Sequence, residues 1–303
     1  MNNPTEQVMD HLRNISIQAL ELIYGLDATR KLIDQYFRVH PSTSETHGQW
    51  FPVKTGHLSM EWVIANGADP NRRILYIHGG SWIAGSLAGY RSFLSHISQA
   101  TGAVVLSIDY RLAPEHTFPA GLEDCIQAYQ WMLENGPDKK SPALAAFLMG
   151  DSAGGNLALA TLLKIKDFSL PLPTAVVAIS PATDLTCGSL SLLTRAFVDP
   201  VINPATLPVL IPLYMGMNAE PTNPYVSPLF GNYAGMPPLL LQVGDLEVLL
   251  DDSTRLAKHA AGHGCKVALE IWDGMPHAFQ GFAPFLPEAS EAINKIGKFI
   301  RQY

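Results

Sequence analysis

The feature that most constrains the fold is a regular alternation of short apolar runs with longer stretches of helical spacing. Each apolar run has the length of one buried strand. The runs are Ile74–Ile77, Ala103–Ile108, Ala145–Met149, Ala175–Ile179, Leu239–Val243 and Val267–Trp272. The helical stretches are Tyr90–Ala100, Pro119–Leu133, Gly155–Lys166, Leu249–Ala261 and Glu288–Gln302. Buried strands that alternate with helices predict an α/β fold, with a mostly parallel central sheet and helices on both faces.

The N-terminal part of the chain lies outside this alternation. Residues from about Glu6 to His40 have helical spacing, and Leu58–Ile64 alternates like a half-exposed strand. We therefore expect residues 1–50 to form N-terminal cap helices. The α/β core is expected to comprise residues 51–183 and 239–303.

A second departure is the interval from Asp184 to Pro238, which is too long for a single crossover between strands. It is rich in proline and apolar residues and contains a short helical stretch at Pro204–Met217. Long loops in compact domains are usually functional or disordered, and this one is too apolar for disorder. We expect residues 184–238 to be a cap insertion over the carboxyl ends of the strands, where such sheets bind ligands. An ordinary long surface excursion is the alternative.

Composition excludes several classes of partner. Apolar residues make up 47% of the 303 residues and charged residues only 16%, which argues for a large core and against disorder. The net charge of −7 offers no electrostatic footprint for nucleic acid or for an anionic membrane surface. No apolar run approaches the length of a membrane span, so no stable membrane association is expected.

The cysteines and the N-terminus bear on the compartment. The three cysteines, Cys125, Cys187 and Cys265, are odd in number and widely spaced, as expected for free thiols in a reducing environment. The first residues contain no basic region followed by an apolar stretch, so we expect no signal peptide. These features predict a cytoplasmic protein.

The sequence Gly-Asp-Ser-Ala-Gly at residues 150–154 follows one of the buried runs and opens a helical stretch. In the context of strand, tight turn and helix, this pattern is typical of a nucleophile elbow, which exposes a serine above the sheet at a helix N-terminus. Ser152 is therefore the candidate nucleophile. A glycine-rich turn without chemistry is the alternative reading.

A nucleophilic serine also needs donors for the oxyanion, and the sequence His-Gly-Gly-Ser-Trp at residues 78–82 directly follows another buried run. Glycines there allow backbone amides to face a tetrahedral intermediate. We assign the amides of Gly80 and Ser81, with Gly79 as a further candidate and Ala153 as the opposite arm. His78 precedes the elbow, and we expect it to orient this loop rather than act as the base.

The base and its orienting acid are expected after the last two strands. His277 lies in the loop after Val267–Trp272, and the chain order serine, acid, histidine is that of α/β-hydrolases. Two acids follow Leu239–Val243: Asp245 is nearer the strand end, and Glu247 lies two residues further on. From position and residue type alone, both remain open.

No cofactor or metal site is predicted. His259 and His263 lie four residues apart on a helical stretch, with Cys265 just beyond, and this resembles the spacing of metal ligands. A helix C-terminus also favours histidine, and no carboxylate pattern of the His-Glu-x-x-His kind accompanies the pair.

Taken together, these motifs resemble those of the hormone-sensitive-lipase-like family of α/β-hydrolases, in particular its microbial (bacterial family IV) esterases. The resemblance covers roughly His57 to the C-terminus. It rests on the residues at 78–80 and 150–155, on His277-Ala278-Phe279, and on Tyr-Arg-Leu-Ala-Pro-Glu-His at residues 110–116. In the family the acid is usually the Asp of an Asp-Pro-Leu-x-Asp run, and that register falls here on Glu247.

The chain departs from the family pattern at two positions. Val248 stands where the acid is usually followed by Pro, and Ser81 stands where a third Gly is usual. An amide donor survives the second change. On this register we favour Glu247 over Asp245 as the triad acid.

The resemblance implies a serine carboxylesterase that hydrolyses small-molecule esters of short acyl chains through a Ser152–His277–Glu247 triad, with no cofactor. It also implies a homodimer that pairs through the last strand, Val267–Trp272. One alternative is a ligand-binding module on the same fold, as in a plant hormone receptor whose catalytic histidine is replaced; His277 is present here. Another alternative is a lipase that acts on longer-chain lipid esters.

Overall fold

One eight-stranded sheet runs through the computed structural model, which describes residues 3–21, 25–217 and 219–303. Its strand order is β1-β2-β4-β3-β5-β6-β7-β8. The strands are β1 (Gln49–Thr55), β2 (Leu58–Ile64), β3 (Asp69–Ile77), β4 (Ala103–Asp109), β5 (Ala145–Asp151), β6 (Ala175–Ile179), β7 (Leu239–Gly244) and β8 (Val267–Trp272). From β4 to β8 all neighbours are parallel, whereas β1 and β2 form an antiparallel extension at one edge. The predicted parallel sheet is confirmed.

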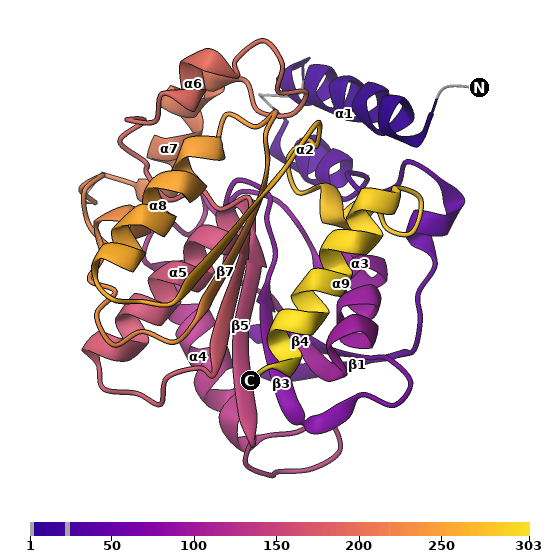
Figure 1. Cartoon of the computed structure of the whole chain (residues 1–303), viewed down its shortest axis with the longest axis vertical. Helices are drawn as coiled ribbons and strands as arrows, with labels where there is room; N and C mark the ends of the chain where they lie inside the picture. The colour runs from indigo at the N-terminus through magenta and orange to yellow at the C-terminus, as the bar shows by residue number, and fades with distance from the viewer. Residues whose placement is uncertain (1–2, 22–24, 218) are drawn as a thin grey trace.

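Helices cover both faces of this sheet, and Figure 1 shows α3 and α9 on one side and α5 and α8 on the other. The helices of the core are α3 (Leu87–Thr101), α4 (Ala120–Glu134), α5 (Ser152–Asp167), α8 (Leu250–Gly262) and α9 (Pro287–Arg301). Alternate residues of each strand enter opposite cores: Leu75 and Leu148 pack with α4 and α5, whereas Tyr76 and Phe147 pack with α3 and α9. This alternation explains why the strands read as continuous apolar runs.

The strand predicted at Leu58–Ile64 is present as β2, but the prediction that it is half-exposed is wrong. Hydrogen bonding to β1 and β4 on either side and packing of α3 against one face bury most of its residues. Its one charged side chain, Glu61, is buried because Arg91 donates two hydrogen bonds of 2.7 Å to it. A glutamate in an alternating pattern predicts an exposed face of a strand, but a glutamate that is paired in this way can be buried.

The N-terminal segment and the first part of the predicted insertion lie beyond the carboxyl ends of the parallel strands (Figure 1). The last part of the insertion, residues 226–236, instead packs against α5 and α8 on one face of the sheet. The N-terminal segment contains α1 (Pro4–Glu21) and α2 (Leu26–Ile33). The insertion contains α6 (Ser191–Thr194), α7 (Leu207–Met215) and the 3-10 turns η2 (Pro204–Thr206) and η3 (Pro228–Phe230). Within the described residues, no helix is both long and apolar enough to cross a membrane.

Candidate active site

Ser152 sits at the junction of β5 and α5, with a positive φ of 55°. L-residues rarely adopt this conformation, and the surrounding backbone maintains it. A side chain at Gly154 would collide with the carbonyl oxygens of Ile77 and His78, so only glycine allows the start of α5 to pass this close to β3. The predicted strand, tight turn and helix are all present, and the first-turn amides of α5 lie beside Ser152.

The residue before the serine, Asp151, is buried and holds the neighbouring loop. Its carboxylate accepts hydrogen bonds from the hydroxyls of Tyr76 (2.8 Å) and Tyr90 (2.9 Å) and from the amide of Gly79 (3.0 Å). Burial raises the pKa of Asp151 although these donors oppose the shift. A carboxylate is tolerated in the protein interior when it is hydrogen-bonded, and these three donors satisfy that of Asp151.

The loop at residues 78–82 turns beside Ser152 with two consecutive left-handed residues, Ser81 (φ 54°) and Trp82 (φ 61°). The carbonyl of Gly80 accepts the amides of both Ile83 (3.1 Å) and Ala84 (2.9 Å), which closes the turn. Gly80, Ser81 and Ala153 line the same cavity as Ser152. The amide of Gly79 is already paired with Asp151 and with the hydroxyl of Tyr90.

His78 lies under this loop and is fully buried. Its Nδ1 forms a hydrogen bond of 2.7 Å with the carbonyl of Gly79, and its ring stacks on Tyr110 at a centroid distance of 4.5 Å. Burial lowers the pKa of His78 to about 4, so the ring is neutral at ordinary pH. Its contacts are those of a loop-orienting residue.

His277 and Glu247 are brought together at the carboxyl ends of β7 and β8. The Nδ1 atom of His277 and Oε2 of Glu247 are 2.7 Å apart, and both side chains are buried. The other candidate acid, Asp245, instead accepts the amide of Gly274 at 2.7 Å. Of the two acids that the sequence left open, Glu247 is the one whose carboxylate contacts the histidine.

Ser180, which the sequence analysis missed, joins the acid to the loop that carries the histidine. Its hydroxyl donates to Glu247 Oε1 (2.7 Å) and accepts the amide of Ala278 (3.1 Å). The amide of Gly244 also donates to Glu247 Oε1, at 2.6 Å. A closed ring of hydrogen bonds therefore runs from the imidazole of His277 through Glu247 and Ser180 back to the peptide that follows His277. The only signal in the sequence is that Ser180 directly follows β6, the strand adjacent to β7.

The environment of His277 favours the charged imidazolium. Burial alone would lower its pKa, but the carboxylates of Glu247, Asp199 and Asp151, with Glu247 contributing most, together more than offset this, so the pKa of His277 lies above its ordinary value. An imidazole that is stabilised as a cation by a buried carboxylate is suited to accept a proton.

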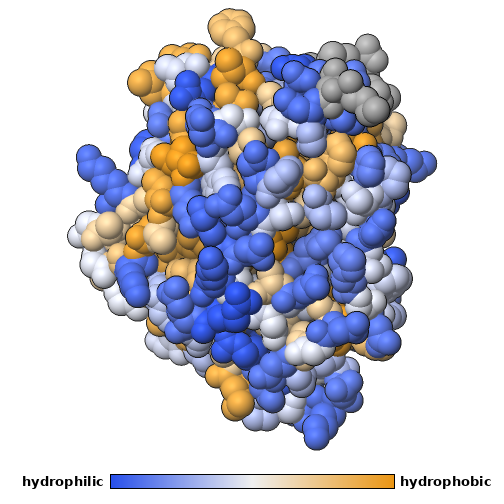
Figure 2. All heavy atoms as spheres, turned by 45° about the vertical axis from the view of Figure 1, so that its right-hand side comes forward, coloured by the Kyte–Doolittle hydropathy of each residue, from blue (hydrophilic) through white to orange (hydrophobic). Residues whose placement is uncertain are grey.

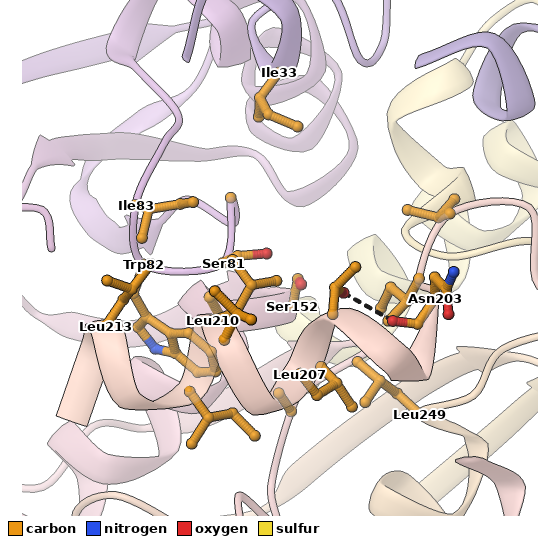
Figure 3. Close-up of a pocket in the computed structure, with 18 of the residues that line it drawn as sticks. Ile33, Ser81, Trp82, Ile83, Ser152, Asn203, Leu207, Leu210, Leu213 and Leu249 are labelled. Carbon is orange, nitrogen blue, oxygen red and sulfur yellow. Dashed lines mark hydrogen bonds between the residues drawn. The ribbon is translucent and has the colours of Figure 1, made fainter. Parts of the chain in front are cut away.

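Ser152 opens into a cavity of about 240 Å³ between the core and both predicted cap segments (Figure 3). Figure 3 shows Ser152 and Ser81 side by side on the core side, with Leu207, Leu210 and Leu213 of α7 along the cavity. The lining side chains are mostly aliphatic. From the N-terminal segment they include Leu12, Ile15, Leu26, Ile33 and Tyr36, and from the insertion Leu192, Val201, Ile202, Leu207, Val209 and Leu210.

The pair His259 and His263 makes contacts with nearby backbone. His259 Nε2 lies 2.8 Å from the carbonyl of Gly231, and His263 Nδ1 lies 3.0 Å from the carbonyl of His259. The thiol of Cys265 is buried and points to the carbonyl of Pro237.

Comparison with known proteins agrees with this architecture. Residues 74–281 match a family described as alpha/beta hydrolase fold. An acetyl-hydrolase from Streptomyces hygroscopicus is 41% identical over 82% of this chain and 81% of its own length. An ethyl acetate hydrolase from Pseudomonas putida is 30% identical over 76% of this chain and 73% of its own. The crystal structure of an esterase from the bacterial hormone-sensitive lipase family superposes with a TM-score of 0.89 at 36% identity, covering 100% of this chain and 99% of that one.

Proposed function

The chain belongs to the hormone-sensitive-lipase-like esterases of the alpha/beta hydrolase fold, and on this premise we propose that Ser152, His277 and Glu247 form its catalytic triad. The protein is a serine carboxylesterase. The single observation that carries the triad is the buried contact of 2.7 Å between His277 Nδ1 and Glu247 Oε2, at the same end of the sheet as the strained Ser152.

In the proposed reaction, Ser152 Oγ attacks the ester carbonyl while His277 Nε2 accepts the hydroxyl proton. Glu247 stabilises the imidazolium and fixes the ring through Nδ1. The tetrahedral intermediate then expels the alcohol, which takes the proton from His277, and an acyl-enzyme remains on Ser152. A water molecule, deprotonated by His277, attacks the acyl group and releases the carboxylic acid with regeneration of the serine.

We assign the oxyanion hole to the amides of Gly80, Ser81 and Ala153. This proposal is supported by their position around the cavity beside Ser152 and by the place of Ala153 in the first turn of α5. Gly79 belongs to the same loop, but its amide is paired with Asp151 and Tyr90. Its role in the proposal is therefore to anchor the hole and not to donate to the oxyanion.

Esters of short acyl chains are the proposed substrates. The aliphatic lining and modest volume of the cavity support small, uncharged groups on both sides of the scissile bond. Relatives named for acetyl and ethyl acetate hydrolysis agree with this size.

The triad is tested by turnover of p-nitrophenyl esters from acetate to decanoate and by labelling with a fluorophosphonate. We expect wild-type protein to be labelled on Ser152 and Ser152→Ala to lose both labelling and turnover. A Ser152→Ala protein with wild-type activity would refute the assignment. A folded wild-type protein that neither turns over esters nor reacts with the probe would favour the ligand-binding module.

A lipase acting on longer-chain lipid esters is the second candidate, because apolar side chains are exposed on the insertion. Phe197 and Met217 are fully exposed, and Leu190 and Leu193 are 64% and 73% exposed. Figure 2 shows hydrophobic residues gathered at the upper end of the molecule, the end that carries α6 in Figure 1. Activity that rises sharply when a long-chain ester exceeds its solubility would favour this candidate.

Three further features belong to the proposal. Residues 1–50 and 184–238 are assigned to a cap over a core of residues 51–183 and 239–303. The shared cavity supports this as far as Tyr36 in the first segment and Leu213 in the second, whereas Gln49 and Trp50 belong to β1 and η3 packs on the core. Two copies pair through β8, supported by its place at the edge of the sheet, and light scattering of the purified protein tests this. The protein works in the cytoplasm, supported by three unpaired cysteines and tested by cell fractionation.

A further inference from the structure

Tyr36, just after α2, reaches from the N-terminal segment to the loop of the proposed catalytic base. Its hydroxyl donates a hydrogen bond of 2.6 Å to the main-chain carbonyl of His277. Its ring packs against Phe37 and Phe282, at centroid distances of 5.0 and 5.8 Å. These ring contacts hold the hydroxyl in place against His277, which is 241 residues away in the sequence.

The peptide unit that accepts this bond is held from its other side as well. Its amide, that of Ala278, donates to Ser180 Oγ at 3.1 Å. Ala278 has a φ of +50°, which a residue with a side chain adopts only when its surroundings impose it. Tyr36 and Ser180 thus bond the two polar atoms of the peptide that directly follows His277, and so restrain the main chain that carries the His277 side chain.

The segment that carries Tyr36 is itself bonded to Ile83, the residue directly after the loop at residues 78–82. Arg30 of α2 donates to the carbonyl of Ile83 (2.7 Å) and makes a two-bond ion pair with Glu115 (2.8 and 2.7 Å). The same short segment therefore bonds the residue next to the proposed oxyanion loop and the main chain of the proposed base. A shift of α2 would therefore disturb both Ile83 and the main chain of His277.

We propose that Tyr36 is a positioning residue of the esterase, through which the seating of the N-terminal segment fixes the orientation of His277 and so sets the rate of the chemical step. This inference rests on the proposed triad. The rate of the chemical step depends strongly on the position of the base, to within a fraction of an ångström. Loss of a hydrogen bond that restrains the base should therefore lower kcat.

The surroundings of Tyr36 keep its hydroxyl a donor over the whole working range of pH. Burial and the nearby carboxylates of Asp199, Glu247 and Asp151 raise the pKa of the Tyr36 phenol well above 10. Those three carboxylates are also the charged groups that act on His277. Because Tyr36 stays neutral, its effect on His277 is one of geometry, and the charge on the imidazole is governed by the carboxylates.

The test compares Tyr36→Phe with Tyr129→Phe. Tyr129 is a matched control because its hydroxyl, also on a buried ring, donates 3.0 Å to the carbonyl of Pro171, at the opposite end of the sheet from Ser152. For Tyr36→Phe we expect kcat on p-nitrophenyl acetate to fall about three- to tenfold with KM within about twofold, as for the loss of one positioning hydrogen bond. The rate of Ser152 labelling by a small fluorophosphonate should fall by the same factor. For Tyr129→Phe, we expect both rates to stay at the wild-type level.

A second pair of variants tests the route through α2. Loosening the segment with Arg30→Ala should lower kcat in the same direction, and the double variant with Tyr36→Phe should lose less than the product of the two single effects, because both act through one restraint. Fully multiplicative losses would overturn the route. The proposal itself is overturned if Tyr36→Phe keeps wild-type kcat, if only KM changes, or if Tyr129→Phe loses as much. Ser152→Ala serves as the reference in the same assay: if it remains active, the triad fails and not merely the role of Tyr36.

Discussion

The hydroxyl of Ser180 donates to Glu247 Oε1 across 2.7 Å and, at the same time, accepts the amide of Ala278. One side chain at the end of β6 therefore couples the loop after β7 to the loop after β8. We predict that Ser180→Ala lowers kcat about tenfold and lowers the free energy of unfolding by about 1–3 kcal/mol, because the buried Ala278 amide loses its acceptor. Steady-state kinetics and urea denaturation check the two effects.

Ser253 of α8 provides the control for this variant. Its hydroxyl is also buried but has no hydrogen-bond partner in the part of the chain that the structure describes. Ser253→Ala should therefore change the free energy of unfolding by less than about 0.5 kcal/mol and leave kcat unchanged. Equal losses in the two variants would mean that Ser180 matters only as a buried serine.

Replacing each of the two candidate acids by its amide should lower kcat by very different factors. Glu247→Gln keeps the shape of the side chain but removes the charge that stabilises the imidazolium, so we expect kcat to fall by about 10²–10⁴. Asp245→Asn should cost less than about tenfold, because the carboxylate of Asp245 accepts the amide of Gly274, whereas that of Glu247 contacts His277. Hydrolysis of p-nitrophenyl acetate measures both. The opposite ranking would assign the acid to Asp245.

The sheet and the position of the nucleophile could be predicted from the sequence because both depend on local patterns. Each buried run became a strand, and the glycines around Ser152 allow a turn that few other residues permit. The same reasoning placed His277 and its two candidate acids at the ends of the correct strands. Strand β1 was missed because its residues are mostly exposed and because Pro52 interrupts its short apolar stretch.

Ser180 and Tyr36 could not be predicted because their roles depend on contacts between segments that are distant in the sequence. Nothing in the residues around Tyr36 indicates that its hydroxyl meets the carbonyl of His277. Position along the chain could not decide between Asp245 and Glu247 for the same reason. Side chains two residues apart in a loop can point in different directions. The family register favoured Glu247, and the folded arrangement shows that Glu247 contacts the histidine whereas Asp245 bonds Gly274.

The pH dependence of catalysis should report the raised pKa of His277. The imidazole acts as a base only when neutral, so activity is lost as pH falls through its pKa. Because Glu247, Asp199 and Asp151 together outweigh the effect of burial, that pKa is raised, and we expect the acid limb of kcat/KM to have its midpoint above pH 6.5. In Glu247→Gln burial acts with less opposition, and the midpoint should move to lower pH.

Asp245→Asn is the matched control for this profile, because it removes a carboxylate from the same loop without removing the partner of His277. Its midpoint should coincide with that of wild type. The carboxylates of Asp199 and Asp151 remain in both variants, so their smaller effects on His277 cancel in the comparison. A midpoint that stays in place in Glu247→Gln would mean that another group governs the acid limb.

The length of acyl chain that the enzyme accepts should depend on α7. Leu210 lines the cavity opposite Ser81 and Ser152 (Figure 3), so the larger ring of Leu210→Trp would take up space that a longer chain needs. We predict that kcat/KM for p-nitrophenyl octanoate falls at least about tenfold, whereas that for acetate stays within about threefold, since overpacking a cavity of this size costs about 1–3 kcal/mol. Leu193→Trp adds the same ring to an exposed position of the insertion, 73% accessible to solvent, and should leave the ratio of the two substrates unchanged. If Leu210→Trp lowers both substrates equally, the chain lies elsewhere and this wall of the cavity does not set the limit.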